Sequence, residues 1–234
     1  MKINNNWINI IQNYLLPPTC ILCGADGMEN LDLCSTCYQN LPVNLNPCQG
    51  CAEALPRHSD QLYCSRCLQK QPIFDNAYVP FLHQGVIRYL ITSLKFSAHY
   101  KNARLLGNLL AKQYPPSQQH PEMIIPVPLH HTRYCHRGFN QSIEIARAVS
   151  QSLNIPLHVT NCIRNRNTPH QTGLSAEKRQ TNLNNAFSII KPISVQHIAI
   201  LDDVMTTGST LHELACTLKQ SGVPRVDVWS CARA

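Results

Sequence analysis

The stretch His197–Thr210, HIAILDDVMTTGST, decides the fold of this chain. Its apolar, β-branched first part is bounded by turn residues, which is typical of a buried parallel strand. Two adjacent carboxylates, Asp202 and Asp203, follow, and a small-residue turn then leads into an expected helix over 210–220. Because open α/β sheets bind ligands outside the carboxyl ends of their strands, we expect a site just past Leu201.

The small-residue turn has the composition of a phosphate-binding loop. Glycine and hydroxyl residues let several backbone N–H groups converge on one anion at the positive end of a helix. The same residues also suit an ordinary helix cap. The paired carboxylates suit the vicinal hydroxyls of a sugar or a divalent metal, because they would repel each other if nothing were bound. A phosphate on one side and a diol on the other describe a ribose 5-phosphate.

This order of residues resembles the phosphoribosyl-pyrophosphate (PRPP) binding motif of the type I phosphoribosyltransferase fold. In that motif an apolar strand, two acids and a T-T-G-S/T loop follow one another. The resemblance implies a parallel α/β sheet with helices on both faces, with Asp202 and Asp203 as the catalytic acids and Mg²⁺ bound together with PRPP. The residues that it assigns to PRPP binding are Val204, Met205, Thr206, Thr207, Gly208, Ser209 and Thr210.

Length and composition predict one α/β domain with a small attached module. The chain has 234 residues, 16 prolines, 12 cysteines and 14% charged residues, which favours a compact chain with many turns. The formal net charge is +7, and eight cysteines bound as thiolates to two zinc ions would reduce it to about +3. Residues 1–70 hold four Lys/Arg against five Asp/Glu, and residues 71–234 hold sixteen against eight. The basic excess therefore lies in the part that resembles a nucleotide-binding domain, where phosphorylated ligands or nucleic acid suit it.

Eight cysteines in four C-x2-C knuckles predict an N-terminal zinc module. Two residues between cysteines place both sulfurs on one tetrahedral ion, and two knuckles close a structural site. A disulfide framework is disfavoured because no secretory segment is evident and the thiols of a cytoplasmic protein stay reduced. Spacing alone leaves sequential and interleaved pairing of the knuckles open, and we favour sequential pairing. The predicted zinc ligands are Cys20, Cys23, Cys34, Cys37, Cys48, Cys51, Cys64 and Cys67.

The chain lacks an apolar run of about 18 residues, the length that a membrane helix needs. Residues 1–18 place apolar side chains at helical spacing as far as two prolines, which predicts an amphipathic helix packed on the body. A contact with a membrane surface or a partner is the alternative reading of this helix. We expect a double zinc-ribbon module over 19–70 and a phosphoribosyltransferase-like domain over 71–234, with 71–80 as the link.

Within that domain, Lys95 follows the first of two expected helices and is either a pyrophosphate ligand or solvated. Trp229 lies on the last expected strand, where it packs in the core or stacks on a base. The expected helices lie near 86–94, 105–110 and 138–154, and the expected strands lie at 123–128, 155–159 and 225–231.

Two loops are assigned by the same resemblance. The loop after the first core strand of the type I fold holds pyrophosphate, and P-V-P-L-x-x-x-R resembles it, although a merely basic surface loop is the alternative. The long polar segment 164–187 occupies the place of the flexible loop that closes over the active site and excludes water. The residues implied are Pro128, Leu129, His130 and Arg133 for pyrophosphate, and Arg164, Arg166, Lys178 and Arg179 for the flexible loop.

The whole order of motifs resembles the ComF family, which includes competence proteins and GntX-like relatives, over about residues 15–233. The resemblance implies a cytoplasmic, PRPP-binding protein that handles imported single-stranded DNA in natural transformation. The competence DNA-uptake machinery at the inner membrane is a candidate partner. One alternative is a phosphoribosyltransferase that acts on an unidentified nitrogen acceptor, for which the sequence offers no distinct acceptor pocket. Another is a scaffold that only senses PRPP.

Overall fold

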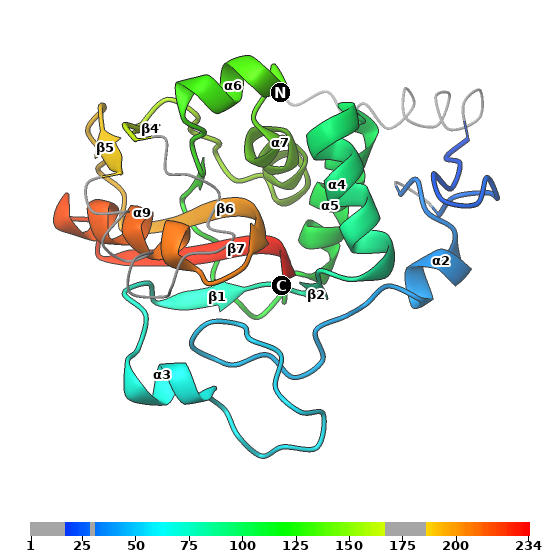
Figure 1. Cartoon of the computed structure of the whole chain (residues 1–234), viewed down its shortest axis with the longest axis horizontal. Helices are drawn as coiled ribbons and strands as arrows, with labels where there is room; N and C mark the ends of the chain where they lie inside the picture. The colour runs from blue at the N-terminus through cyan, green and yellow to red at the C-terminus, as the bar shows by residue number, and fades with distance from the viewer. Residues whose placement is uncertain (1–16, 29–30, 167–185) are drawn as a thin grey trace, which may run out of the picture. The chain divides into compact units, whose positions relative to one another are not determined.

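The computed structural model describes residues 17–28, 31–166 and 186–234 (Figure 1). The chain divides into two compact units, Met1–Leu41 and Pro42–Ala234. The first unit contains α2 (Ser35–Gln39) and the first four of the predicted zinc ligands. The amphipathic helix expected over 1–18 lies, apart from its last two residues, outside the described residues. The expected module boundary at residue 70 stays a prediction.

The second unit is built on a parallel sheet in the order β1-β7-β6-β3, with β2 also paired to β7. A separate antiparallel pair, β4 with β5, stands beside it. The strands are β1 (Asn76–Tyr78), β2 (Phe81–Leu82), β3 (Met123–Pro126), β4 (Cys162–Arg164), β5 (Phe187–Ile189), β6 (His197–Met205) and β7 (Arg225–Arg233). The helices are α3 (Ser65–Gln69), α4 (Gly85–Ser97), α5 (Tyr100–Gln113), α6 (His131–Arg137), α7 (Gln141–Leu153) and α9 (Ser209–Gln220).

Side chains alternate between the two faces of the sheet along each strand, so both faces carry apolar side chains that need to be buried. Both faces of this sheet are covered. On one face Ile198 and Ile200 of β6 join Leu214 of α9 in a buried cluster, to which the second set of four cysteines also belongs. On the other face Trp229 of β7 is fully buried against the rings of Tyr78 and Tyr114. Trp229 is therefore a core residue. The expected phosphoribosyltransferase-like architecture, a parallel sheet with helices on both faces, is confirmed.

The strand that carries the acids is longer than the sequence suggests. We expected β6 to end at Leu201, but it continues to Met205 because its partner β7 continues alongside to Arg233. Asp202 and Asp203 therefore lie within the paired strand, and the strand ends four residues later than expected, directly before the small-residue turn. The helices near 86–94, 105–110 and 210–220 and the strand at 225–231 are confirmed as parts of α4, α5, α9 and β7.

Three local predictions are wrong. The cationic segment expected as a loop forms α6, because the His130 side chain accepts a hydrogen bond from the Thr132 N–H and Gly138 ends the helix at φ +80°. The strand expected at 155–159 is reduced to one bridge between Leu157 and Ile124. The segment 71–80, expected as a link, supplies edge strand β1.

Candidate functional site

The paired acids of β6 are held by side chains from two helices. The Ser142 hydroxyl donates to Asp202 at 2.8 Å, and the Gln141 amide donates to Asp203 at 3.2 Å. The second oxygen of Asp203 forms an ion pair with the Lys95 ammonium from α4. Gln141 and Ser142 lie in the first turn of α7, whose positive end favours nearby carboxylates.

A buried asparagine fixes the start of α7. The Asn140 side chain accepts a hydrogen bond from the Ser142 N–H at 2.9 Å and so caps the helix. Its amide also donates to the Val127 carbonyl, at 2.9 Å, just past the end of β3. The Asn140 cap therefore joins the carboxyl end of β3 to the N-terminus of α7, the end of the helix that contacts the acids. The ends of β3 and α7 thus meet at the acid pair of β6.

The two acids differ in charge at neutral pH. Burial, together with the neighbouring charge of Asp203, raises the pKa of Asp202 to about 7. Burial acts on Asp203 in the same direction, but the Lys95 ammonium outweighs it and lowers the pKa of Asp203 below its ordinary value. The pair therefore holds a firm negative charge on Asp203 beside a carboxyl that is half-protonated near pH 7. Such a pair accepts hydrogen bonds from a diol or binds a divalent cation.

The turn after β6 has the geometry of an anion-binding loop. Gly208 adopts φ +78° and caps α9, which begins at Ser209. The hydroxyls of Thr207 and Ser209 lie 2.8 Å apart, so two oxygens stand together at the positive end of that helix. The left-handed φ of Gly208 favours glycine here, and a Cβ would also lie 2.7 Å from the Met205 terminal methyl, which would have to move.

The other residues assigned to PRPP surround this turn. Thr206 is exposed, whereas Met205 is buried and packs under the turn. Val204 and Thr210 are partly buried, on the strand and in the first turn of α9 respectively. The structure thus brings the acids and the small-residue turn onto one continuous strand, loop and helix.

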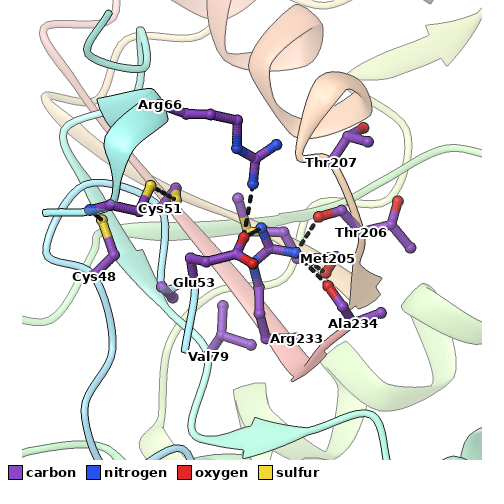
Figure 2. Close-up of polar contacts among 12 residues, drawn as sticks. Cys48, Cys51, Glu53, Arg66, Val79, Met205, Thr206, Thr207, Arg233 and Ala234 are labelled. Atoms are coloured by element: carbon purple, nitrogen blue, oxygen red, sulfur yellow. Dashed lines mark hydrogen bonds and ion pairs between the residues drawn. The ribbon is translucent and has the colours of Figure 1, made fainter. Parts of the chain in front are cut away.

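A buried arginine fixes the backbone at the start of the turn. Arg233 of β7 is 4% exposed, and its guanidinium donates to the carbonyls of Met205 (3.0 Å), Thr206 and Ala234 (2.7 Å) (Figure 2). The same guanidinium pairs with the Glu53 carboxylate, which lies two residues after Cys51. A peptide unit points its C=O and N–H in opposite directions, so holding these carbonyls also sets the direction of the next amides.

The segment expected to hold pyrophosphate is partly helical. Pro128, Leu129 and His130 lead from β3 into α6, and Arg133 stands within α6. Arg137, at the end of α6, donates to the Gln141 side chain. Burial lowers the pKa of Arg137, and the charges of Asp203 and Asp202 act in the opposite direction. Arg137 therefore senses the acid pair, and the assignment of Arg133 to pyrophosphate stays a prediction.

The flexible-loop residues are only partly described. Arg164 lies on β4 with its guanidinium 5.5 Å from the centre of the Phe187 ring, and burial lowers its pKa. Arg166 is exposed. Lys178 and Arg179 lie outside the described residues, so their expected role in closing the site stays a prediction.

The eight knuckle cysteines form two groups, as the spacing predicts. The thiols of each group all lie within 4.8 Å of one another, and the grouping is sequential: Cys20, Cys23, Cys34 and Cys37, then Cys48, Cys51, Cys64 and Cys67. The sulfurs of Cys23 and Cys34 are 3.7 Å apart, and those of Cys51 and Cys64 are 3.6 Å apart. Four sulfurs about 2.3 Å from a tetrahedral zinc ion stand about 3.8 Å apart. Both groups therefore fit structural zinc.

A cleft of ≈ 690 Å³ lies between the second zinc group and the turn after β6. One wall consists of Thr207, Gly208 and Ser209 with His212 from α9. The opposite wall comes from α3 and the residues that follow it, including Arg66, Lys70 and Phe74. Burial and the nearby Lys70 lower the pKa of His212, so this imidazole is neutral at pH 7. The cleft has room for a group attached to a phosphate bound at the turn.

Sequence reasoning missed several residues of this site. From the sequence, Gln141 and Ser142 are predicted only as polar residues at the start of a helix, and their contacts with the acids are not. The Asn-Gln-Ser run before an apolar pattern is nevertheless a capping signal. Glu53 and Arg233 are 180 residues apart in the chain. No local pattern brings two such positions together, so only the folded structure reveals their pairing.

The parallel sheet, the acid pair, the glycine-capped turn and two four-cysteine groups together define a phosphoribosyltransferase-like protein with a double zinc ribbon. The family described as "Double zinc ribbon domain" matches residues 11–68. The "DNA utilization protein YhgH" of Escherichia coli (strain K12) is 34% identical over 224 residues, which cover 93% of this chain and 98% of that protein. "Competence protein F" of Haemophilus influenzae is 33% identical over 225 residues, covering 92% and 96%. The chain belongs to the ComF family, as its motifs predict.

Solved structures are more distant. A glutamine PRPP amidotransferase from B. subtilis is 20% identical, with a TM-score of 0.39 over 56% of this chain and 26% of that one. An adenine phosphoribosyltransferase from Leishmania tarentolae is 16% identical, with a TM-score of 0.35 over 59% and 58% of the two chains. Among the helices that the structure describes, none combines the length and the hydropathy that crossing a membrane requires.

Proposed function

We propose that this chain is a PRPP-binding protein of the cytoplasm that handles imported single-stranded DNA in natural transformation. The observation that supports it most is the joining of Asp202 and Asp203 to the Gly208 turn within one strand, loop and helix. Carboxylates that accept a diol thus precede backbone amides and hydroxyls that bind a phosphate. The DNA role is carried over from relatives named for DNA utilization and competence.

In this proposal the ribose 5-phosphate of PRPP lies between the acids and the turn. The backbone from Val204 to Ser209 and the hydroxyls of Thr206, Thr207 and Thr210 bind the 5-phosphate. Asp202 and Asp203 accept the ribose hydroxyls, and Mg²⁺ bound with them would neutralise the pyrophosphate. The expected segment 128–133, together with Arg137, supplies cations for the pyrophosphate itself.

Calorimetry with PRPP and Mg²⁺ tests this ligand. The wild-type protein is expected to bind, and the double variant Asp202→Asn/Asp203→Asn is expected to lose binding while both zinc ions stay in place. Zinc is measured on the same samples, so a folding defect is separated from a lost ligand contact. Equal affinity in the two proteins would rule out the acids as ligands.

The DNA part of the proposal rests on charge. The region 71–234 holds twice as many basic as acidic residues, which favours a phosphate backbone. We expect single-stranded DNA to be retained by the intact protein and released as salt rises. Equal retention of heparin at matched charge would show that the binding is not specific for DNA.

A phosphoribosyltransferase that acts on an unidentified nitrogen acceptor is the second candidate, because an acid pair and a phosphate-binding turn on one strand, loop and helix suit PRPP as a substrate as well as a ligand. A nitrogen nucleophile would attack C1 of PRPP, the new C1–N bond would replace the C1–O bond, and pyrophosphate would leave. The segment 164–187, with its arginines and lysine, would close over the site and exclude water. Release of pyrophosphate with a panel of nitrogen bases tests this activity.

Binding without turnover would instead favour a protein that senses PRPP. In that case PRPP would change the affinity for DNA or for the uptake machinery at the inner membrane. Measuring DNA affinity with and without PRPP separates this sensing role from a purely structural use of the fold.

A further inference from the structure

The exposed aromatic side chains of this protein are concentrated on three neighbouring helices. In the described residues, the aromatic rings that are well exposed are Tyr89 (57%) and Phe96 (75%) on α4, Tyr100 (50%) on α5 and Tyr134 (48%) on α6. Burying an aromatic ring contributes a large favourable hydrophobic free energy, which an exposed ring does not provide. Four exposed rings on one part of a surface therefore indicate a binding face. We call these three helices with their rings the aromatic–basic face.

Direct contacts link the three helices. The Arg137 guanidinium of α6 lies 5.9 Å from the centre of the Phe96 ring of α4. The ring of Tyr100, at the start of α5, lies 4.9 Å from the ring of Phe139, just after α6. In Figure 1 α6 runs near the ends of α4 and α5, in agreement with these contacts. The rings therefore belong to one continuous surface.

The corner between α4 and α5 is rigid. Ala98 turns the chain at φ +51°, and the buried Asn102 amide donates to the Ser93 hydroxyl (2.6 Å) and to the Leu90 carbonyl (3.3 Å). These bonds fix the two helices against each other beneath Phe96 and Tyr100. Tyr89 and Phe96 are seven residues apart, so they lie on the same side of α4, about 10 Å apart along its axis. The helices that carry the rings are thus fixed relative to each other before any ligand binds.

The helices that carry these rings, and the segments that join them, are mainly basic. Residues 76–143 contain seven Lys/Arg and six His but one acidic residue, Glu122. Glu122 accepts hydrogen bonds from the N–H groups of Gln196 and His197 at the start of β6, the end of that strand opposite the acids. The helices α4, α5 and α6 contain no acidic residue, and the basic Arg88 and Lys101 are exposed beside the rings. A polyanion is the ligand that complements this surface.

We propose that the aromatic–basic face binds single-stranded nucleic acid by stacking unpaired bases on Tyr89, Phe96 and Tyr100 while its cations contact the phosphates. Base stacking on exposed rings beside a basic groove is the common mode of sequence-tolerant single-strand binding. A duplex hides the faces of its bases, so the face favours single strands. This inference rests on the proposed function, and it names the surface and the kind of contact through which DNA is held.

The test uses two oligonucleotides with the same phosphates. One is oligo-dT of about 20 nucleotides, a length that exceeds a single site, and the other is an abasic strand of equal length. Binding of both to the full-length protein is followed by fluorescence anisotropy at several salt concentrations. Wild type is expected to bind oligo-dT more tightly than the abasic strand, since only the bases can stack.

Two triple variants separate the rings from the rest of the surface. Tyr89→Leu/Phe96→Leu/Tyr100→Leu keeps apolar volume but removes the aromatic rings. It is expected to lose about fivefold or more in oligo-dT affinity per ring and to bind the abasic strand as wild type does. The matched control Tyr89→Phe/Phe96→Tyr/Tyr100→Phe keeps three rings and is expected to bind both strands like wild type. Lys101→Gln should weaken both strands equally and reduce the salt dependence by about one phosphate contact.

The outcomes are distinct. If the leucine variant binds oligo-dT as tightly as wild type, or wild type binds the two strands equally, the stacking face is refuted while the PRPP proposal stands. Equal losses for oligo-dT and the abasic strand would also refute it, because stacking affects only a strand with bases. If wild type retains no single-stranded DNA at any salt concentration, the proposed DNA function fails together with this inference.

Discussion

The Lys95 ammonium forms an ion pair with Asp203, although the two residues are more than 100 positions apart and lie on different elements. The carboxylate side chain is 4% exposed and that of the lysine 23%. Lys95 therefore balances the charge of the less exposed acid in the absence of ligand. A bound Mg²⁺ or sugar hydroxyl would have to share or displace this contact.

Lys95→Met is expected to leave the Asp203 carboxylate buried without its counter-ion. Breaking a buried pair in this way costs on the order of 3 kcal/mol of unfolding free energy at neutral pH. The loss should shrink when Asp203 is also changed to Asn, because no uncompensated charge then remains. Urea unfolding of the two single variants and the double variant measures the coupling. Strictly additive losses would show that the pair contributes nothing specific.

Asp202→Asn is expected to stabilise the protein above pH 7. The raised pKa of Asp202, about 7 against the ordinary 3.8, means that the folded state keeps a proton that the unfolded chain has released. Wild-type stability should therefore fall as pH rises from about 4 to about 7, by up to ~1.4 kcal/mol per pKa unit. The variant lacks this cost, so its advantage should be largest above pH 7 and vanish near pH 4. Thermal melts across this range that stay parallel for the two proteins would contradict the assignment.

Gly208→Ala is expected to distort the turn, with Gly222→Ala as a matched control. Both glycines have positive φ, +78° and +99°, so both substitutions cost about 1 kcal/mol for the left-handed backbone. At Gly208 the new Cβ also meets the Met205 methyl at 2.7 Å, whereas nothing lies within 4 Å at Gly222. We expect PRPP affinity to fall by about tenfold or more in the first variant only, a change of about 1.4 kcal/mol. Equal affinities in the two variants would show that the turn does not bind the ligand.

Glu53→Gln is expected to loosen the turn from the side of the second zinc group. Arg233 would lose its charged partner, and the carbonyls of Met205 and Thr206 would be held less firmly. We expect amide hydrogen exchange over 205–209 to rise and PRPP affinity to fall about tenfold, with zinc content unchanged.

The matched control for this change is Glu144→Gln. Glu144 also pairs with an arginine, Arg147, but at the surface of α7. The control is expected to leave both exchange and affinity near wild type, since exposed pairs contribute little. Unchanged exchange over 205–209 in Glu53→Gln would show that the arginine does not need this carboxylate.

The two zinc groups are expected to differ in their effect on the sheet. The second group belongs to the buried cluster of α9 and β6, whereas the first lies in the unit Met1–Leu41. Cys51→Ser should therefore lower the melting temperature of the sheet by about 5 °C or more, and Cys23→Ser should leave that transition in place. Each variant should lose one zinc ion by metal analysis. Equal shifts would contradict the separate roles of the two groups.

The sequence predicts the parts of this site that are local. The C-x2-C spacing predicts both cysteine groups because a knuckle is made by neighbouring residues. The order of apolar strand, acids and glycine turn predicts the β6–α9 connection for the same reason. The end of β6 lies further along the chain than the sequence predicts, because strand length depends on pairing with β7, a strand that begins only at residue 225.

The errors and omissions share a tertiary origin. A polar, histidine-rich run reads as a loop, but the caps at His130 and Gly138 make it α6. The pairing of Glu53 with Arg233 depends on packing the second zinc group against the sheet. The sequence predicts Lys95 either at pyrophosphate or in solvent, and it gives no sign of the contact with Asp203 because α4 and β6 meet only in the folded chain.

The most direct measurement is a crystal structure of the protein with PRPP and Mg²⁺. We predict the 5-phosphate at the Gly208 turn, within hydrogen-bond distance of the backbone amides over 206–209, and the ribose hydroxyls at Asp202 and Asp203. Lys95 should then have moved towards the pyrophosphate or share Asp203 with the ligand. A crystal in which PRPP binds elsewhere, while the turn and the acid pair keep only protein contacts, would contradict the account.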